Sequence, residues 1–173
     1  MTGIPIMVRQ RGFSLVEVLV ALLVLSIGLL GISKLVLISA RANDSAYLRS
    51  QATALAYSIL DAMHANRQAA IAGNYATAAA SGVMSPGVQC NNAAPCTNTS
   101  ILAQYDLYQW RQRLLALGPS GDGKVVMATV TDPVSGTNST TATITVTWDD
   151  TVAQQSTGVP AGGTMAVTLE TIL

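Results

Sequence analysis

Charged side chains are scarce in this sequence and their signs balance. Only 10% of the 173 residues are Asp, Glu, Lys or Arg, and nine basic residues offset nine acidic ones. Because no run of Lys or Arg is present, the chain offers no basic surface for nucleic acid. Half of the residues are hydrophobic, so the chain is too apolar to be disordered and too poor in charge for an ordinary soluble domain.

Residues suited to catalysis or metal binding are equally few. The single histidine, His64, has no second histidine or cysteine in register, and the two cysteines, Cys90 and Cys96, enclose five residues. That spacing does not match a zinc or thioredoxin-type motif. Adjacent strand residues point to opposite faces, so we expect Asp149 and Asp150 in a solvated turn rather than in a catalytic carboxylate pair. We therefore expect no enzyme activity, no cofactor and no metal.

One glycine-rich segment matches part of a nucleotide-binding loop. Residues Gly118-Pro-Ser-Gly-Asp-Gly-Lys124 fit the first seven positions of the P-loop pattern, but Val125 replaces the hydroxyl residue that would contact magnesium. The segment also follows an expected helix and enters an expected strand, which reverses the order found in a P-loop. We interpret it as a turn.

The one long apolar run contains a single acid near its start. Between Phe13 and Ser33 the only charged residue is Glu17, and two cations, Arg9 and Arg11, precede the run. A charged side chain inside a bilayer costs about 2.5–3.5 kcal/mol on the translocon scale, so it is rarely kept without a partner. A secretory signal has a shorter apolar core followed by a small-residue cleavage site, and an ordinary single span would leave the acid unpaired. Neither reading explains Glu17.

Residues Arg11-Gly-Phe-Ser-Leu-Val-Glu17 resemble the processing motif of type IV pilins and pseudopilins. The resemblance implies that a prepilin peptidase cleaves between Gly12 and Phe13, which removes residues 1–12 as a leader, and that Phe13 is then N-methylated. It also implies that Glu17 pairs with the free N-terminus of a neighbouring subunit. A carboxylate–ammonium pair within a helix bundle is tolerated where a lone carboxylate in lipid is not.

The apolar stretch from Glu17 to Gly31 is similar to that of the PilV group of minor pilins, and less closely to I-type minor pseudopilins of type II secretion. The resemblance implies a single-pass inner-membrane protein with a periplasmic head that later joins a cell-surface pilus. Its partners would be the prepilin peptidase, other minor pilins and the major pilin, and its role would lie in pilus assembly, adhesion or twitching motility. An I-type pseudopilin with pseudopilin partners is the alternative. A membrane-anchored periplasmic binding protein is a third, less favoured hypothesis.

Residues 14–68 have the pattern of one long helix with two different halves. The first half, in residues 13–40, is apolar all round and suits lipid or a filament core. The second half has an apolar seam spaced by three and four residues, which predicts docking onto a sheet; its members are Leu48, Ala52, Leu55, Ile59 and Met63.

The rest of residues 41–173 predicts a small α+β head. Asp106–Leu117 has the pattern of a short amphipathic helix, and three alternating segments, at 126–130, 142–148 and 165–169, predict an antiparallel sheet of three to four strands. In the first strand the apolar alternation falls on Val126, Ala128 and Val130. Trp110 and Trp148 lie on apolar faces, so we expect both in the core. In a domain outside the cytoplasm we also expect a Cys90–Cys96 disulfide, with two free thiols as the alternative.

Overall fold

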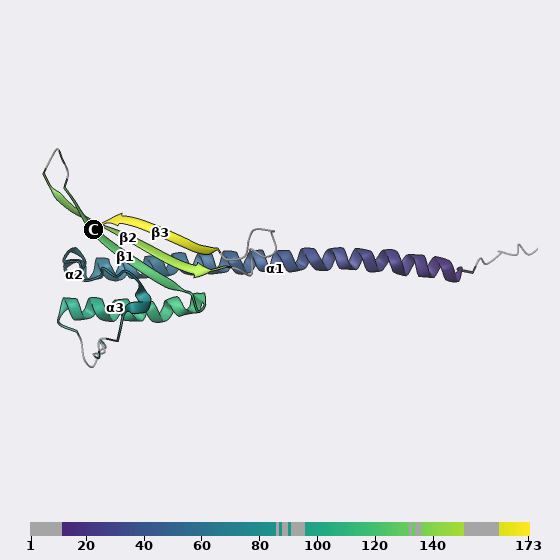
Figure 1. The fold of residues 1–173 in the computed structure, drawn as a ribbon, viewed down its shortest axis with the longest axis horizontal. Coiled ribbons are helices and arrows are strands. Elements are labelled where there is room, and N and C mark those ends of the chain that lie inside the picture. The colour runs from purple at the N-terminus through teal and green to yellow at the C-terminus, as the bar shows by residue number, and fades with distance from the viewer. Residues whose placement is uncertain are drawn as a thin grey trace, which may run out of the picture. The chain divides into compact units, whose positions relative to one another are not determined.

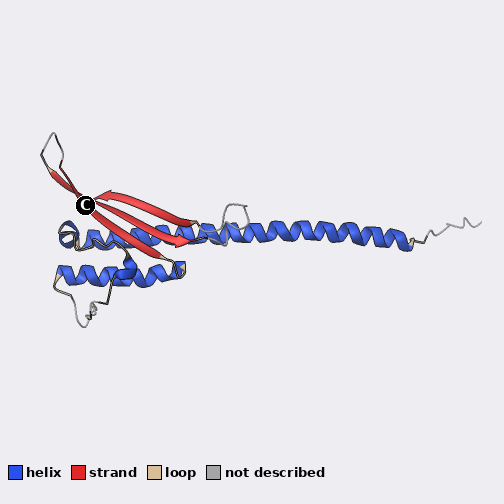
Figure 2. Cartoon of the chain, viewed as in Figure 1, coloured by secondary structure: helices blue, strands red, loops and turns tan. Residues whose placement is uncertain are grey.

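The computed structural model describes residues 12–85, 87, 90, 96–131, 133, 136–150 and 163–173. Figure 1 shows the long N-terminal helix together with the shorter helices and the sheet, and Figure 2 separates helices from strands by colour. The α-helices and strands, in chain order, are α1 (Leu15–Ala65), α2 (Arg67–Ile71), α3 (Thr99–Leu114), β1 (Asp122–Thr131), β2 (Asn138–Asp149) and β3 (Thr164–Ile172). This arrangement confirms the predicted α+β class, with a long N-terminal helix and a small antiparallel sheet.

Helix α1 contributes residues to two compact units, which divide between Ala40 and Arg41. In the first unit every large apolar side chain from Leu15 to Leu37 is between 49% and 77% exposed. This part of the helix therefore has no core of its own. Its stability in water would rest on backbone hydrogen bonds alone, so an apolar environment or other helices must cover it.

The second half of α1 packs against the rest of its unit along the predicted seam. Ala52, Ile59 and Met63 are buried, and Leu48 and Leu55 lie partly buried against them, which confirms the seam. The helix ends at Ala65, and α2 begins two residues later, so the predicted single helix over 14–68 is interrupted at Asn66. Asn66 is buried and donates its Nδ2–H to the carbonyl of Thr99 over 2.7 Å, which ties the end of α1 to the start of α3.

Helix α3 begins seven residues before the predicted start at Asp106. The reason is Asn98, whose side-chain oxygen accepts from the backbone N–H groups of Ser100 and Ile101 and so caps the helix. A single 3₁₀ turn, Leu115–Leu117, finishes the helix, and Gly118 follows with φ 105°. Figure 1 shows α3 beside the C-terminal part of α1.

The sheet is an antiparallel meander in the order β1-β2-β3. Its buried face comes mainly from the central strand, in the alternating residues Ala142, Ile144, Val146 and Trp148. The pairing places Val125 opposite Ile144, and Ile144 opposite Leu169, so all three strands contribute to one apolar layer.

The alternating apolar residues predicted for β1 lie on the exposed face of the sheet, not on its buried face. Val125 is buried, whereas Val126 and Val130 are 41% and 50% exposed. The register is set at Gly123, where a Cβ atom would lie 2.3 Å from Cη2 of Trp110. Since only glycine leaves room for the indole, Gly123 faces the core and Val125 shares its face.

Candidate functional site

The predicted cleavage point lies just outside α1. Gly12, Phe13 and Ser14 precede the helix, and Phe13 is 84% exposed. The carbonyl of Ser14 accepts the first helical hydrogen bonds, from the N–H groups of Glu17 and Val18 at 3.0 and 3.3 Å. The Gly12–Phe13 peptide bond is therefore non-helical and exposed, as a protease requires, while the helix starts two residues later. Of the expected leader, residues 1–12, only Gly12 belongs to the described residues.

Glu17 is in the first turn of α1, where a negative charge is favoured by the helix dipole. Ser14 and Glu17 have the spacing of a capping box, a reading that would make the acid purely local. Yet within the described part of the chain neither side chain makes a capping hydrogen bond, and no cation lies within ion-pair distance of Glu17. The carboxylate is exposed on an apolar helix and can take a partner from another molecule.

A shallow groove along the first turns of α1 holds both predicted motif residues. It is lined by Phe13, Glu17, Val18, Ala21, Leu22 and Leu25. Glu17 is the only charged residue in this lining, so the groove consists of apolar side chains around one carboxylate. Such a surface suits a helix that brings its own positive charge.

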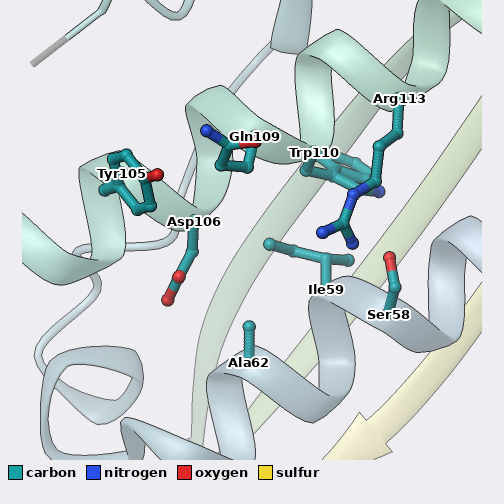
Figure 3. A pocket seen from close by; sticks show the side chains of 8 residues that line it. All are labelled: Ser58, Ile59, Ala62, Tyr105, Asp106, Gln109, Trp110 and Arg113. Atoms are coloured by element: carbon teal, nitrogen blue, oxygen red, sulfur yellow. The ribbon is translucent and has the colours of Figure 1, made fainter. Parts of the chain in front are cut away.

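A second, polar cavity of about 200 Å³ lies in the head, between α1 and α3. Figure 3 shows its lining, with Asp106 and Arg113 on α3 facing Ser58, Ile59 and Ala62 on α1. Burial raises the pKa of Asp106, while the hydroxyl of Tyr75 and the charge of Arg113 oppose that rise. The lining holds no histidine, cysteine or second carboxylate that could form a catalytic pair with Asp106.

Tyr75 is the residue that the sequence reasoning missed. It is completely buried and its hydroxyl donates to Oδ2 of Asp106 over 2.5 Å, while Nδ2 of Asn66 approaches the same hydroxyl at 3.4 Å. Burial and the adjacent carboxylate raise the pKa of Tyr75, so it stays a hydrogen-bond donor. No motif or regular spacing in the sequence predicts that these three residues meet. Their hydrogen bonds connect the end of α1, the middle of α3 and the segment after α2.

The glycine-rich segment at 118–124 is a helix-to-strand turn, as expected. A Cβ atom at Gly121 would lie 2.2 Å from the carbonyl oxygen of Leu114, and Gly118 has a positive φ. Both glycines therefore serve the turn geometry. The two tryptophans are core residues, each 1% exposed, which confirms the prediction for Trp110 and Trp148.

Asp150 does not lie in a solvated turn, and that expectation was wrong. Its side chain is 6% exposed and accepts a short hydrogen bond from the hydroxyl of Ser45 on α1. The bond holds the end of β2 against the helix. Asp149 is exposed, as expected for one member of an adjacent pair.

The two cysteines are joined in the structure. Cys90 and Cys96 form a disulfide with a Cα–Cα distance of 5.1 Å. His64 is exposed in the last turn of α1, and the described residues contain no group of three His, Cys, Asp or Glu side chains placed to hold a metal ion.

Comparison with known proteins gives one match, at the N-terminus. Residues 7–33 match the family model of the prokaryotic N-terminal methylation motif. No curated protein and no solved structure matches the chain significantly. Among the described residues, α1 is the one helix long and apolar enough to cross a membrane. The motif and this helix together support a type IV pilin-like protein with a membrane anchor.

Proposed function

We propose that this chain is a minor type IV pilin of the PilV kind. It is processed by a prepilin peptidase between Gly12 and Phe13, N-methylated at Phe13, held in the inner membrane with its head in the periplasm, and then assembled into a pilus. There it takes part in assembly or initiation and in adhesion or twitching motility, through contacts with other minor pilins and the major pilin.

The observation that carries this proposal is the environment of Glu17. A carboxylate on an apolar helix with no cation near it in the described structure is costly in a membrane unless a partner arrives from outside. Cleavage before Phe13 creates an ammonium group on every subunit, four residues before the acid. A neighbouring chain therefore supplies the missing charge, while the exposed leucines and valines of residues 13–40 supply packing area.

Two measurements test processing and pairing separately. Mass spectrometry of the N-terminal peptide is expected to give N-methylated Phe13; an intact Met1, or cleavage elsewhere, overturns the proposal. For pairing, Glu17→Ala is expected to remain in the membrane but to be lost from sheared pili.

The chain provides its own matched control for the second measurement. Glu170 is its only other glutamate and is exposed on β3, outside the apolar helix. Glu170→Ala is expected in sheared pili at the wild-type level. If both variants assemble equally well, Glu17 does not pair as proposed.

An I-type pseudopilin of a type II secretion system is the second candidate, because the motif and the apolar helix suit it equally well. The two are separated by deletion: loss of pili or twitching motility supports the minor pilin, whereas loss of protein secretion with normal pili supports the pseudopilin.

A further inference from the structure

Within the described residues of the first unit, only two side chains carry a charge, Glu17 and Lys34. The hydroxyl groups of Ser26 and Ser33 are satisfied locally, since each donates over 2.8 Å to a carbonyl of the preceding turn. Lys34 is exposed and has no acid within ion-pair distance among the described residues. Apart from Glu17, Lys34 is thus the charged group among the described residues of the first unit that needs an outside partner.

The length of the helix decides where that partner lies. The residues between Phe13 and Lys34 rise about 30 Å at 1.5 Å per residue, which equals the hydrocarbon thickness of a typical bilayer. The next cation is Arg41, and the residues between Phe13 and Arg41 rise about 40 Å. Fitting that longer span into the hydrocarbon would need a tilt of about 40°, at the upper limit seen for membrane helices, and would bury Lys34.

We propose that Lys34 binds lipid phosphates at the periplasmic face of the inner membrane and thereby sets the depth of the anchor. The proposal rests on the proposed function, because it takes the N-terminus at Phe13 as the cytoplasmic end of the span. The hydrocarbon then ends at Lys34, and Leu35, Val36 and Leu37 lie at the level of the headgroups although they are 52–67% exposed apolar residues.

The chemistry of the lysine suits this role. Its ammonium is a compact, strongly hydrated charge on a flexible stem, so it can reach a phosphate while its methylene groups stay against the lipid tails. Without it the apolar run would continue to Ala40, longer than the hydrocarbon, and the helix would slide inward or tilt to cover the excess.

Thiol labelling of the full chain in phospholipid nanodiscs tests the depth. The native cysteines are paired with each other and do not compete. Leu37→Cys and Leu29→Cys are placed on either side of Lys34, and Tyr47→Cys, in the head, normalises the rates. We expect a charged maleimide to label Leu37→Cys readily and Leu29→Cys hardly at all.

The lysine is then changed in the Leu37→Cys background. Lys34→Leu is expected to lower the labelling rate by about threefold or more as the helix slides inward, whereas Lys34→Arg leaves it unchanged. Protection of Leu37→Cys in the unaltered helix, or an equal rate with Lys34→Leu, overturns the proposal.

The same variants, labelled in detergent micelles, distinguish between two further explanations. If Lys34→Leu has the same effect in maltoside micelles, which contain no phosphate, then hydration of the charge sets the depth and the phosphate contact is wrong. An effect confined to phospholipid supports the contact. Failure of the proposed function is recognised separately, by an intact Met1 in the same protein.

Discussion

The hydroxyl of Tyr75 donates a 2.5 Å hydrogen bond to Oδ2 of Asp106, thirty-one residues later in the chain. The bond joins the segment after α2 to the middle of α3, and Asn66 at the end of α1 completes the group by approaching the same hydroxyl at 3.4 Å. A few buried polar atoms thus fix three separate segments of the head relative to one another.

Removal of the tyrosine hydroxyl should destabilise the head. Tyr75→Phe leaves a half-buried carboxylate without its donor, and a hydrogen bond to a charged group contributes about 1.5–3 kcal/mol. We expect a loss of unfolding free energy of that order in urea titrations of the detergent-solubilised chain. Tyr57→Phe is the matched control, since Tyr57 is 49% exposed and its change should stay within about 0.5 kcal/mol.

The same pair predicts a pH dependence of stability. Because burial raises the pKa of Asp106, with the bond from Tyr75 and the charge of Arg113 opposing, the folded chain holds this proton more tightly than the unfolded chain does. The contribution of Asp106 is complete below its ordinary pKa and is lost as the pH rises through the raised value. We expect Asp106→Asn to remove this gain on acidification, as measured by urea midpoints between neutral and acidic pH.

Asp122 serves as a control, because its effect on the pH dependence of stability should have the opposite sign. Burial favours its protonation, but hydrogen bonds from the N–H groups of Ser81 and Gly123, both 2.8 Å, outweigh that effect and lower the pKa. Its contribution is present above the ordinary pKa and is lost as the pH falls through the lowered value. Asp122→Asn should therefore weaken the acid-induced loss. Identical pH profiles for both asparagine variants would contradict the assignment.

A methyl group at Gly123 should disturb the core. The added Cβ would lie 2.3 Å from Cη2 of Trp110, whose indole N–H also donates to the carbonyl of Leu55 over 2.9 Å. Overpacking of this kind costs about 1–3 kcal/mol, and we expect Gly123→Ala to lower the melting temperature and shift the tryptophan fluorescence. Gly82→Ala has open space around its Cβ and should leave both signals unchanged.

The contribution of the N-cap of α3 to stability can be measured by changing Asn98 alone. Oδ1 of Asn98 accepts from Ser100 N–H at 2.9 Å and from Ile101 N–H at 3.4 Å. Asn98→Ala is expected to lower the unfolding free energy by about 0.5–2 kcal/mol, whereas Asn98→Asp, which keeps an acceptor at the helix N-terminus, should restore it. Equal stability of all three proteins in urea would show that Asn98 does not cap the helix in solution.

We expect Cys90 and Cys96 to be fully paired in the purified protein. Thiol titration of the denatured chain is expected to find no reactive thiol at Cys90 or Cys96. By the loop-entropy model, replacing both with serine should reduce stability by about 2 kcal/mol, measured as a lower urea midpoint. Two titratable thiols per chain would favour the alternative of unpaired cysteines.

Much of the fold could be predicted because it follows local patterns. The long apolar run predicts the first half of α1, the spacing of Ala52, Ile59 and Met63 predicts the buried seam, and the alternation in β2 predicts its core face. The predicted start of α3, at Asp106, lies seven residues too late; Asn98, a residue type favoured at the N-cap, marks the actual start of the helix.

The sequence by itself determined the motif around Phe13 and Glu17, the exposed apolar helix and its one embedded acid, since these depend on residues close together in the chain. Only the tertiary structure decided which face of β1 is buried, because Trp110 must pass over Gly123, and that Asp150 is buried beside Ser45. It likewise brought Tyr75 to Asp106. These contacts join residues far apart in the chain. The periodicity of a segment does not show where a distant side chain will pack against it.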